Sequence, residues 1–395
     1  MQEMPPVMTG NKLMQKKNKE HIYLDYAAHT PADDRVLSAF IAAAQSFTAN
    51  ANSPHPPGQA AKARFREAAE RIAALLHVKP DDIIFTSGAS ESNNLALKGA
   101  AENNKRYGKH IITTPLEHSS VNGPLAYLQQ QGFEIDCCEL NCDGTVDIDH
   151  LSSLLRRDTI LVSVCWVDSE LGIVQPIKDI SAMLSGRAHC MFHTDATQAV
   201  GKIPISLNGI GLASFAPHKF YGLCGSGMLV CGENVVLEPQ IHGGISSTPF
   251  RSGTPALELA VAAESALEIA LSELQSRYQT VHALNAQLIK ALRNLPGVLI
   301  NSTTASVPHI VNLSLPGIKT DRIQALLGEK GIYVATRSAC CAPGTVSRPV
   351  YALTHNKKAA LSTMRISLSH LTPEEDIGLF IQCLKDSLEE YRGAL

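Results

Sequence analysis

The stretch Ser214-Phe215-Ala216-Pro217-His218-Lys219-Phe220-Tyr221-Gly222 brings a short apolar run to a lysine and then to a turn. Upstream, His193-Thr194-Asp195-Ala196-Thr197-Gln198 places an aspartate shortly after the apolar run Cys190-Met191-Phe192. Short apolar runs that end in polar turns are typical of buried strands. Because open α/β sheets bind their ligands beyond the carboxyl ends of the strands, we expect Asp195 and Lys219 to face a ligand site.

Outward from these two stretches, short buried strands alternate with helices. Apolar periodicity predicts strands at 83–86, 110–114, 135–138, 160–165, 190–193 and 212–215, and helices at 59–76, 91–101 and 119–131. Strands that alternate with helices of this length indicate an α/β fold with a mostly parallel, doubly wound sheet.

The pattern changes in the C-terminal third. Residues 256–294 are expected to form one long helix or two in succession, followed by strands at 310–313, 332–335 and 364–368 and helices at 320–329 and 373–390. This mixture predicts a smaller α+β domain that residues near Ile22 complete. We therefore expect a flexible extension at 1–20, a large domain at 35–260, and a small domain at 21–34 and 261–395.

Bulk composition excludes several classes of protein. The chain has 395 residues, of which 45% are hydrophobic and 18% charged, with a net charge of -3. This balance is that of a globular protein without a basic surface for nucleic acid. No apolar run approaches the roughly 20 residues that span a bilayer, and residues 1–20 lack the apolar core of a secretion signal. We expect a cytoplasmic protein that does not bind a membrane.

The ten cysteines include no Cys-x-x-Cys pair, so the spacing of zinc ligands is absent from the sequence. In a chain of this length without a signal peptide we expect reduced thiols and no bound metal.

Lys219 and Asp195 together suit pyridoxal phosphate chemistry. A lysine holds the cofactor aldehyde as a Schiff base, and a carboxylate keeps the pyridine nitrogen protonated so that the ring accepts electrons. Taken one at a time, the two residues also fit a solvated amine and a surface carboxylate, which is where most Lys and Asp side chains lie.

Other candidates fall at strand-to-helix junctions. The turn Ser87-Gly88-Ala89-Ser90-Glu91 offers free backbone N–H groups and a hydroxyl for a phosphate. His118 could stack on a pyridine ring and move protons, or only bond to a helix end. Arg365 interrupts an alternating strand and suits a substrate carboxylate, although a surface salt bridge explains it nearly as well.

Cys340 lies in Thr336-Arg337-Ser338-Ala339-Cys340-Cys341-Ala342-Pro343-Gly344, a stretch of small and turn residues that predicts a loop. A thiol on such a loop is accessible, and Arg337 favours its thiolate. The residue is then a nucleophile, an exposed bystander, or one half of a redox pair with Cys341.

Together these segments resemble the cysteine desulfurases of the NifS/IscS type, which belong to the class V aminotransferase group of fold-type I pyridoxal phosphate enzymes. The likeness runs from Ile22 to beyond Arg365. The matching motifs are Ile22-Tyr23-Leu24-Asp25-Tyr26-Ala27-Ala28, Phe85-Thr86-Ser87-Gly88-Ala89-Ser90-Glu91-Ser92-Asn93-Asn94, Glu117-His118, His193-Thr194-Asp195-Ala196-Thr197-Gln198, His218-Lys219, Arg251-Ser252-Gly253-Thr254 and Arg337-Ser338-Ala339-Cys340.

The resemblance implies a role for each matched residue around the cofactor ring. Lys219 would form the Schiff base and later act as base at the substrate Cα, and Asp195 would pair with the pyridine nitrogen. Gln198 would donate to the cofactor phenolate, and His118 would stack on the ring. Asp168 stands where the family has an asparagine that faces the phenolate and the substrate carboxylate, so a charged Asp168 is expected to repel both.

The resemblance also implies the phosphate and substrate contacts. Ala89, Ser90 and His218 would hold the phosphate, joined by Thr254 from the partner subunit of a homodimer. Arg365 would bind the substrate carboxylate. Cys340 would take the sulfur of cysteine, leaving alanine and a persulfide. An iron–sulfur scaffold or a tRNA-thiolation protein would then accept the sulfur.

Four further positions depart from the family pattern: Ala216 replaces a serine, Gly243-Gly244-Ile245-Ser246-Ser247 replaces Gly-Gly-Gly-Gln-Glu, His29 replaces a threonine, and Cys341 replaces a small Ser or Thr. Two alternatives therefore stay open. The chain could act on another amino acid, such as selenocysteine or cysteine sulfinate, or it could be a non-catalytic scaffold of the same fold.

Overall fold

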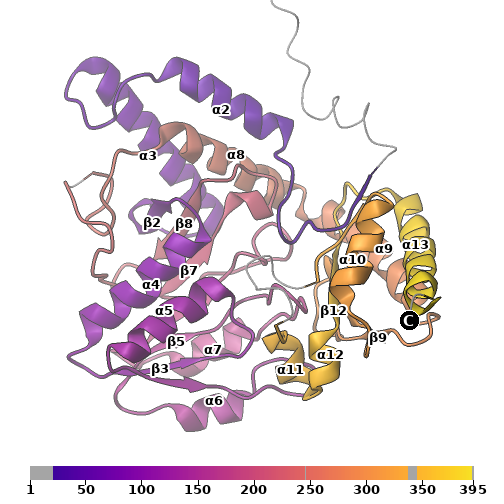
Figure 1. Cartoon of the computed structure of the whole chain (residues 1–395). Coiled ribbons are helices and arrows are strands. Elements are labelled where there is room, and N and C mark those ends of the chain that lie inside the picture. Colours follow the sequence, from indigo (N-terminus) through magenta and orange to yellow (C-terminus); the bar gives the residue numbers. More distant parts are fainter. Residues whose placement is uncertain (1–20, 245, 337–344, 394–395) are drawn as a thin grey trace, which may run out of the picture.

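The computed structural model describes residues 21–244, 246–336 and 345–393. Its largest sheet has seven strands in the order β2-β8-β7-β6-β5-β3-β4. These strands are β2 (Ile83–Thr86), β3 (His110–Thr113), β4 (Glu134–Cys137), β5 (Thr159–Ser163), β6 (Met191–Asp195), β7 (Leu212–Phe215) and β8 (Gly227–Cys231). Figure 1 shows part of this sheet, with β2, β8, β7, β5 and β3 labelled. Only β8 runs antiparallel to its neighbours, β2 and β7. The mostly parallel sheet is confirmed, and β8 is a strand that the sequence patterns did not predict.

Different helices cover the two faces of this sheet, because successive residues of a strand point to opposite sides. One face packs against α3 (Pro56–Leu76), α6 (Ile148–Leu154), α7 (Ile177–Leu184) and α8 (Leu257–Ser272), and the other against α4 (Ala89–Asn104) and α5 (Ser119–Gln130). Ile83 of β2 belongs to the first core and the adjacent Ile84 to the second. The expected doubly wound arrangement is therefore present, with α2 (Asp34–Ser46) added against α8.

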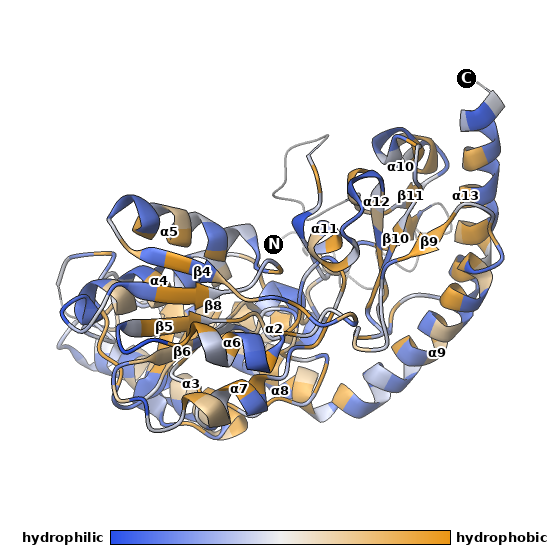
Figure 2. Ribbon diagram, turned by 90° about the horizontal axis from the view of Figure 1, so that it is seen from below, coloured by the Kyte–Doolittle hydropathy of each residue, from blue (hydrophilic) through white to orange (hydrophobic). Residues whose placement is uncertain are grey.

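A smaller body is built on the antiparallel sheet β12-β10-β9. Its elements are α9 (Leu274–Leu292), β9 (Leu299–Ile300), β10 (Ile310–Ser314), α10 (Thr320–Glu329), β12 (Thr363–Ser367) and α13 (Glu374–Gly393). Figure 2 shows this body beside the large one, with α9 and α13 along its outer side. The 256–294 region is thus two helices, α8 and α9, rather than one.

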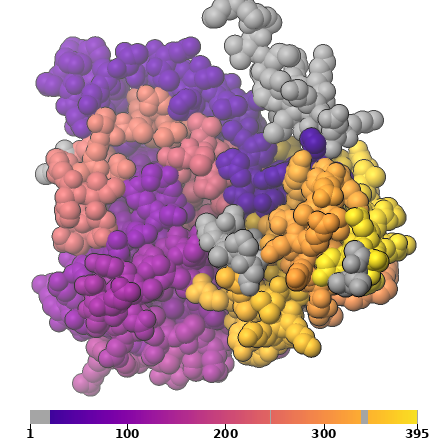
Figure 3. All heavy atoms as spheres, in the orientation of Figure 1, coloured from indigo at the N-terminus to yellow at the C-terminus, as the bar shows by residue number. Residues whose placement is uncertain are grey.

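The N-terminal segment joins the small body although it is distant in sequence. β1 (Ile22–Tyr23) pairs in parallel with β11 (Ile332–Tyr333), and Leu24 is buried in the same apolar core as β10 and β12. Figure 3 shows these N-terminal residues in indigo against the orange C-terminal part. The expected strand at 332–335 is shorter than predicted, and the domain boundaries 21–34 and 261–395 stay a prediction.

The short helices α11 (Arg348–Thr354) and α12 (Lys357–Leu361) complete the C-terminal part. Among the helices of the described ranges, none combines the length and the apolar character needed to cross a membrane.

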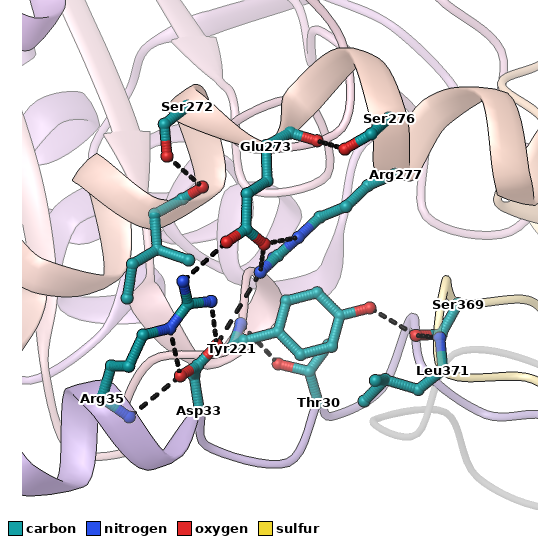
Figure 4. A network of polar contacts seen from close by, with 11 residues as sticks. Thr30, Asp33, Arg35, Tyr221, Ser272, Glu273, Ser276, Arg277, Ser369 and Leu371 are labelled. Atoms are coloured by element: carbon teal, nitrogen blue, oxygen red, sulfur yellow. Dashed lines mark hydrogen bonds and ion pairs between the residues drawn. The ribbon is translucent and has the colours of Figure 1, made fainter.

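A network of hydrogen bonds and ion pairs, drawn in Figure 4, connects the two bodies where α8 meets α9. Glu273 lies between the two helices and accepts hydrogen bonds from Arg35 Nη1 (2.6 Å) and Arg277 Nη2 (2.7 Å). The hydroxyl of Tyr221 lies 2.5 Å from Ser369 Oγ. The turn that follows Lys219 is therefore tied directly to the C-terminal body.

Candidate active site

A pocket of about 390 Å³ opens where the parallel strands end. Its walls come from the segments after β2, β3, β5, β6 and β7, from the N-terminal segment, and from β12. The lining residues include nine that the sequence predicted: Ala89, Ser90, His118, Asp168, Asp195, Gln198, His218, Lys219 and Arg365. Asp195 and Lys219 thus face one ligand-sized space, as the ends of adjacent strands β6 and β7 require.

Among the described residues, one predicted residue is not part of the pocket walls. Thr254 is exposed and does not line the pocket. Arg251, three residues earlier in the same motif, donates to Glu91 Oε1 at 2.9 Å and so anchors this segment beside the pocket. Cys340 and its neighbour Cys341 lie outside the described residues.

Lys219 leaves the short 3-10 helix η2 (Pro217–Lys219) after β7, with its side chain directed at the N-terminal segment. Its Nζ donates hydrogen bonds to the carbonyl oxygens of Ala27 (2.9 Å) and Ala28 (2.7 Å). The amine is therefore held at the pocket wall by two neutral acceptors, where an aldehyde can reach it.

Asp195 is held in place by a buried asparagine that the sequence analysis did not single out. Asn93, in α4, donates from Nδ2 to Asp195 Oδ2 (2.8 Å) and to Ser120 Oγ (2.9 Å), and Ser120 Oγ lies 2.8 Å from His118 Nδ1. The backbone N–H of Thr197 donates to the other carboxylate oxygen at 3.0 Å. No local signal marks Asn93 in the sequence, because its burial, which makes a specific partner necessary, is known only from the fold.

His118 begins α5 and is mostly buried in the pocket wall. Its Nδ1 accepts from the backbone N–H of Ser120 at 3.2 Å, so the ring caps the helix. Burial lowers the pKa of His118, a tendency that Asp195 opposes. The helix-end role considered in the sequence is therefore present, and the ring still faces the pocket.

The turn before α4 forms an anion cradle. Among the described residues no side chain caps the α4 N-terminus, and its first residues, Ala89 and Ser90, line the pocket. Gly227 of β8 lies so close behind that a Cβ there would be 2.4 Å from the carbonyl carbon of Gly88. Uncapped backbone N–H groups at a helix start favour a phosphate.

His218 places an unpaired ring nitrogen beside this pocket. Its Nδ1 is buried and has no hydrogen-bond partner in the described part of the chain. Burial lowers the pKa of His218 to about 4, and the nearby Lys219 acts in the same direction. A buried ring nitrogen without a partner is costly, and an oxygen ligand in the pocket would satisfy it.

Arg365 enters the pocket from the middle of β12 and is 2% exposed. Its Nη1 donates to Ser169 O and its Nη2 to Asp25 Oδ1, both at 2.8 Å, while Nε is buried without a partner among the described residues. The guanidinium is thus not a surface salt bridge. It faces the pocket with bonding capacity left for a carboxylate.

Asp168 lines the pocket, and its carboxylate is also bonded within its own turn. Its Oδ1 accepts from Glu170 N (3.0 Å) and its Oδ2 from Leu171 N (2.6 Å), so the carboxylate closes its own turn. Burial raises the pKa of Asp168 to about 7. These two facts weaken the repulsion that we expected between Asp168 and a bound anion.

Glu117 and Cys165 form a buried pair that the sequence analysis did not assign. Glu117 Oε1 accepts from Thr114 Oγ1 and from Cys165 N, both at 2.8 Å, while its Oε2 lacks a partner among the described residues. Burial raises the pKa of Glu117 to about 8. Only Cys165 of the two lines the pocket.

The residues present fit pyridoxal phosphate. The pocket supplies an amine for the aldehyde, a carboxylate for the pyridine nitrogen, an uncapped helix start with a partnerless His218 nitrogen for the phosphate, and a guanidinium for a substrate carboxylate. These groups come from several segments around one pocket, as a flat ligand held at several edges requires.

Comparisons with known proteins agree with this geometry. The aminotransferase class V family model matches residues 22–380. Cysteine desulfurase IscS of Vibrio atlanticus (strain LGP32) is 36% identical over 386 residues, which cover 94% of this chain and 93% of that protein. A solved structure of a NifS-like protein is 34% identical with a TM-score of 0.87, covering 93% of this chain and 99% of its own. A structure of SspA in complex with cysteine is 30% identical with a TM-score of 0.76, covering 88% and 98%.

The matched region spans both bodies of the fold and all described parts of the pocket. The resemblance found in the sequence is therefore confirmed: this chain belongs to the aminotransferase class V family.

Proposed function

We propose that this protein is a cysteine desulfurase, which converts L-cysteine to L-alanine and passes the sulfur as a persulfide to an acceptor protein. One observation carries the proposal: Lys219, Asp195 and Arg365 line a single pocket in a chain that matches cysteine desulfurases over almost its whole length. The chain is a pyridoxal phosphate-dependent enzyme of its family.

Pyridoxal phosphate supplies an electron sink, which lets bonds at the substrate Cα and Cβ break at neutral pH. Lys219 would hold the cofactor through its Nζ and, once released by the substrate amine, move the Cα proton. Asp195, oriented by Asn93, would hold the proton on the ring nitrogen. His118 would stack on the ring, and Gln198 would donate to its phenolate oxygen.

The phosphate would lie at the start of α4, where Ala89, Ser90 and the imidazole of His218 face the pocket. Thr254 would contribute to this phosphate site from the partner subunit of a homodimer. Its exposure on a segment anchored at Glu91 supports that arrangement, because an exposed hydroxyl beside one pocket can reach a neighbouring copy.

Arg365 would bind the substrate carboxylate. Its present partners are one carboxylate, Asp25, and one backbone carbonyl, and its partnerless Nε can add a bond to an incoming anion. A buried guanidinium that gains a carboxylate forms charge-assisted bonds, which are stronger than neutral ones.

Sulfur transfer would use the thiolate of Cys340. It attacks the sulfur of the bound cysteine, the C–S bond breaks as the S–S bond forms, and the carbon that keeps the electron pair takes up a proton. The balance is cysteine plus enzyme thiol to alanine plus enzyme persulfide, with no outside oxidant. We propose a cytoplasmic acceptor for this sulfur, an iron–sulfur scaffold or a tRNA-thiolation protein, as in iron–sulfur cluster assembly.

The experiment is a stoichiometric assay on purified holoenzyme. With L-cysteine we expect alanine in amounts equal to the sulfur transferred, and a mass increase of one sulfur atom on the peptide that contains Cys340. Cys340→Ala should abolish the persulfide, whereas the matched variant Cys341→Ala should keep it. A persulfide that survives in Cys340→Ala would refute the role of this residue.

The same assay separates the alternatives. Faster alanine formation from selenocysteine or cysteine sulfinate, unaffected by Cys340→Ala, would identify a lyase for another amino acid. A protein that stays colourless with added cofactor, and that borohydride does not label, would identify a non-catalytic scaffold.

A further inference from the structure

Lys202 is a buried lysine behind the candidate active site, in the turn that follows β6. It is 8% exposed, and its Nζ donates a hydrogen bond to Gln198 Oε1. None of the described carboxylates forms an ion pair with it. Buried lysines without a charged partner are rare. The role of Lys202 is therefore sought in its one side-chain hydrogen bond among the described residues, to Gln198.

Among the described residues, no other side chain accepts a hydrogen bond from Lys202 Nζ. Lys202 lines a small cavity together with Arg277, His309 and His370, and no carboxylate of the described residues contributes to its walls. Burial lowers the pKa of Lys202 well below its usual range, and Lys219 and Arg365 act in the same direction. In either protonation state the nitrogen keeps N–H bonds to donate.

The nitrogen end of the Gln198 amide faces a backbone carbonyl oxygen, which can accept a hydrogen bond but cannot donate one. Gln198 Nε2 donates to the carbonyl oxygen of Ala27 at 2.9 Å, and Lys219 Nζ donates to the same oxygen at 2.9 Å. A continuous line of hydrogen bonds therefore joins Lys202, Gln198, Ala27 and Lys219. The orientation of the amide follows from both ends: Ala27 requires its nitrogen, and Lys202 requires its oxygen.

An amide nitrogen carries two N–H bonds, and Ala27 accepts one of them. Gln198 also lines the pocket, so the second N–H is available to a ligand there. If the amide rotated, its oxygen would instead face the ligand.

We propose that Lys202 is a positioning residue, which holds the Gln198 amide with its nitrogen toward the pocket so that it donates to the oxygen anion of the cofactor ring. The inference rests on the proposed function for the cofactor and for Gln198. It adds a residue that touches neither cofactor nor substrate and that acts only through the amide.

Removing Lys202 leaves Gln198 Oε1 buried without a donor, so only the bond to Ala27 O still fixes the amide and its alignment with the ring oxygen weakens. The ring oxygen then loses a donor and becomes more basic, so the nitrogen of Lys219 bound to the cofactor keeps its proton to higher pH. The charged and titratable groups that line the pocket or act on Lys219 are His29, Glu91, His118, Cys165, Asp168, Asp195, Lys202, His218 and Arg365. All of these groups except Lys202 are unchanged in a Lys202 variant. A shift in the midpoint of the pH titration is therefore caused by the loss of Lys202.

The test is a pH titration of the visible absorption of the holoenzyme, without substrate. Lys202→Met should raise the midpoint pH of the colour change by about 0.5 to 1 unit. Lys202→Arg, which keeps a donor, should titrate like the unaltered protein. Should Lys202→Met not fold, as judged by its melting temperature and circular dichroism, Lys202→Leu, which also lacks a donor, takes its place.

A double-mutant cycle distinguishes positioning from a direct charge effect. In a Gln198→Ala background, Lys202→Met should add no further shift. An equal shift in both backgrounds would overturn the inference, and so would an unchanged midpoint in the single variant. If the unaltered protein binds no coloured cofactor at all, the proposed function fails first and this inference with it.

Discussion

The guanidinium of Arg277 lies over the ring of Tyr221, with 4.8 Å between its central carbon and the ring centre. Tyr221 follows Lys219 by two residues and has a φ of 69°, in the left-handed region that a tyrosine rarely adopts. Arg277 also bonds to Glu273 at the α8–α9 junction. The contact therefore holds the turn that carries the candidate cofactor lysine against the joint between the two bodies.

We expect this cation–π pair to show coupling in a double-mutant cycle. Arg277→Met and Tyr221→Leu, alone and together, should give a coupling energy of about 1 to 2 kcal/mol in denaturant unfolding, because Arg277 is only 6% exposed. Lys98 over Tyr127 is the matched control, at 5.3 Å with Tyr127 48% exposed, and should couple by about 0.5 kcal/mol. Additive effects at Arg277 and Tyr221 would show that the pair contributes nothing.

Gly227→Ala is predicted to weaken cofactor binding. Its Cβ would meet the backbone of Gly88 at 2.4 Å and push the turn before α4 toward the pocket. A displaced anion cradle loses aligned N–H groups, so we expect about tenfold weaker binding of pyridoxal phosphate, or about 1.4 kcal/mol, in a titration followed by absorbance. Gly123→Ala in α5, where a Cβ meets nothing within 4 Å, is the control. Equal affinities in both variants would contradict the phosphate assignment.

Glu117→Gln should change how stability depends on pH. Burial raises the pKa of Glu117 from about 4.5 to about 8, so between these values the folded state holds a proton that the unfolded state releases. Stability is then highest below about pH 4.5 and falls as pH rises toward 8. The amide keeps the accepting Oε1 and stays neutral, so the variant should gain about 4 kcal/mol relative to the unaltered protein on going from pH 5 to pH 8.5.

The measurement for Glu117 is urea unfolding at several pH values, with the exposed Glu139→Gln as control. A difference between Glu117→Gln and the unaltered protein that stays constant with pH would mean that Glu117 is ionised in the fold.

Asp168→Asn should destabilise the protein rather than strengthen ligand binding. An amide has one acceptor oxygen, whereas both Asp168 oxygens accept backbone N–H groups, so one of these bonds is lost in the turn. We expect a loss of about 1 to 2 kcal/mol in urea unfolding at pH 5, which shrinks toward pH 8 because the raised pKa of Asp168 makes its ionised form costly there, and unchanged or weaker cofactor affinity. The exposed Asp179→Asn should have neither effect. Tighter cofactor binding by Asp168→Asn would restore the repulsion that the sequence suggested.

The strands and helices around the motifs were predictable because their periodicity is local. Strand 83–86, strand 212–215 and helix 320–329 coincide with β2, β7 and α10. β8 was not, because Gly227-Met228-Leu229-Val230-Cys231 is apolar without alternation and carries no polar motif. β8 matters for the site because it places Gly227 against the turn at Gly88.

The pocket residues also divide into those that the sequence predicted and those that it did not. Lys219, Asp195 and Arg365 were predicted because a charged residue within or shortly after an apolar run is unusual and can be recognised in the sequence. Asn93 and Lys202 were missed, since each is an ordinary polar residue in a helix or turn until its burial is known.

The sequence by itself determined which chemical groups this protein has and which strand ends carry them, because side-chain type and apolar periodicity are written in consecutive residues. Only the tertiary structure decided which of these groups lie close enough to hydrogen-bond to one another or to face a common ligand. Burial sets the pKa values of Glu117 and Asp168, and contacts between residues far apart in the chain, such as Lys219 with Ala27 or Arg365 with Asp25, set their orientation. Desolvation and hydrogen-bond geometry depend on the whole packed environment, and no window of sequence contains it.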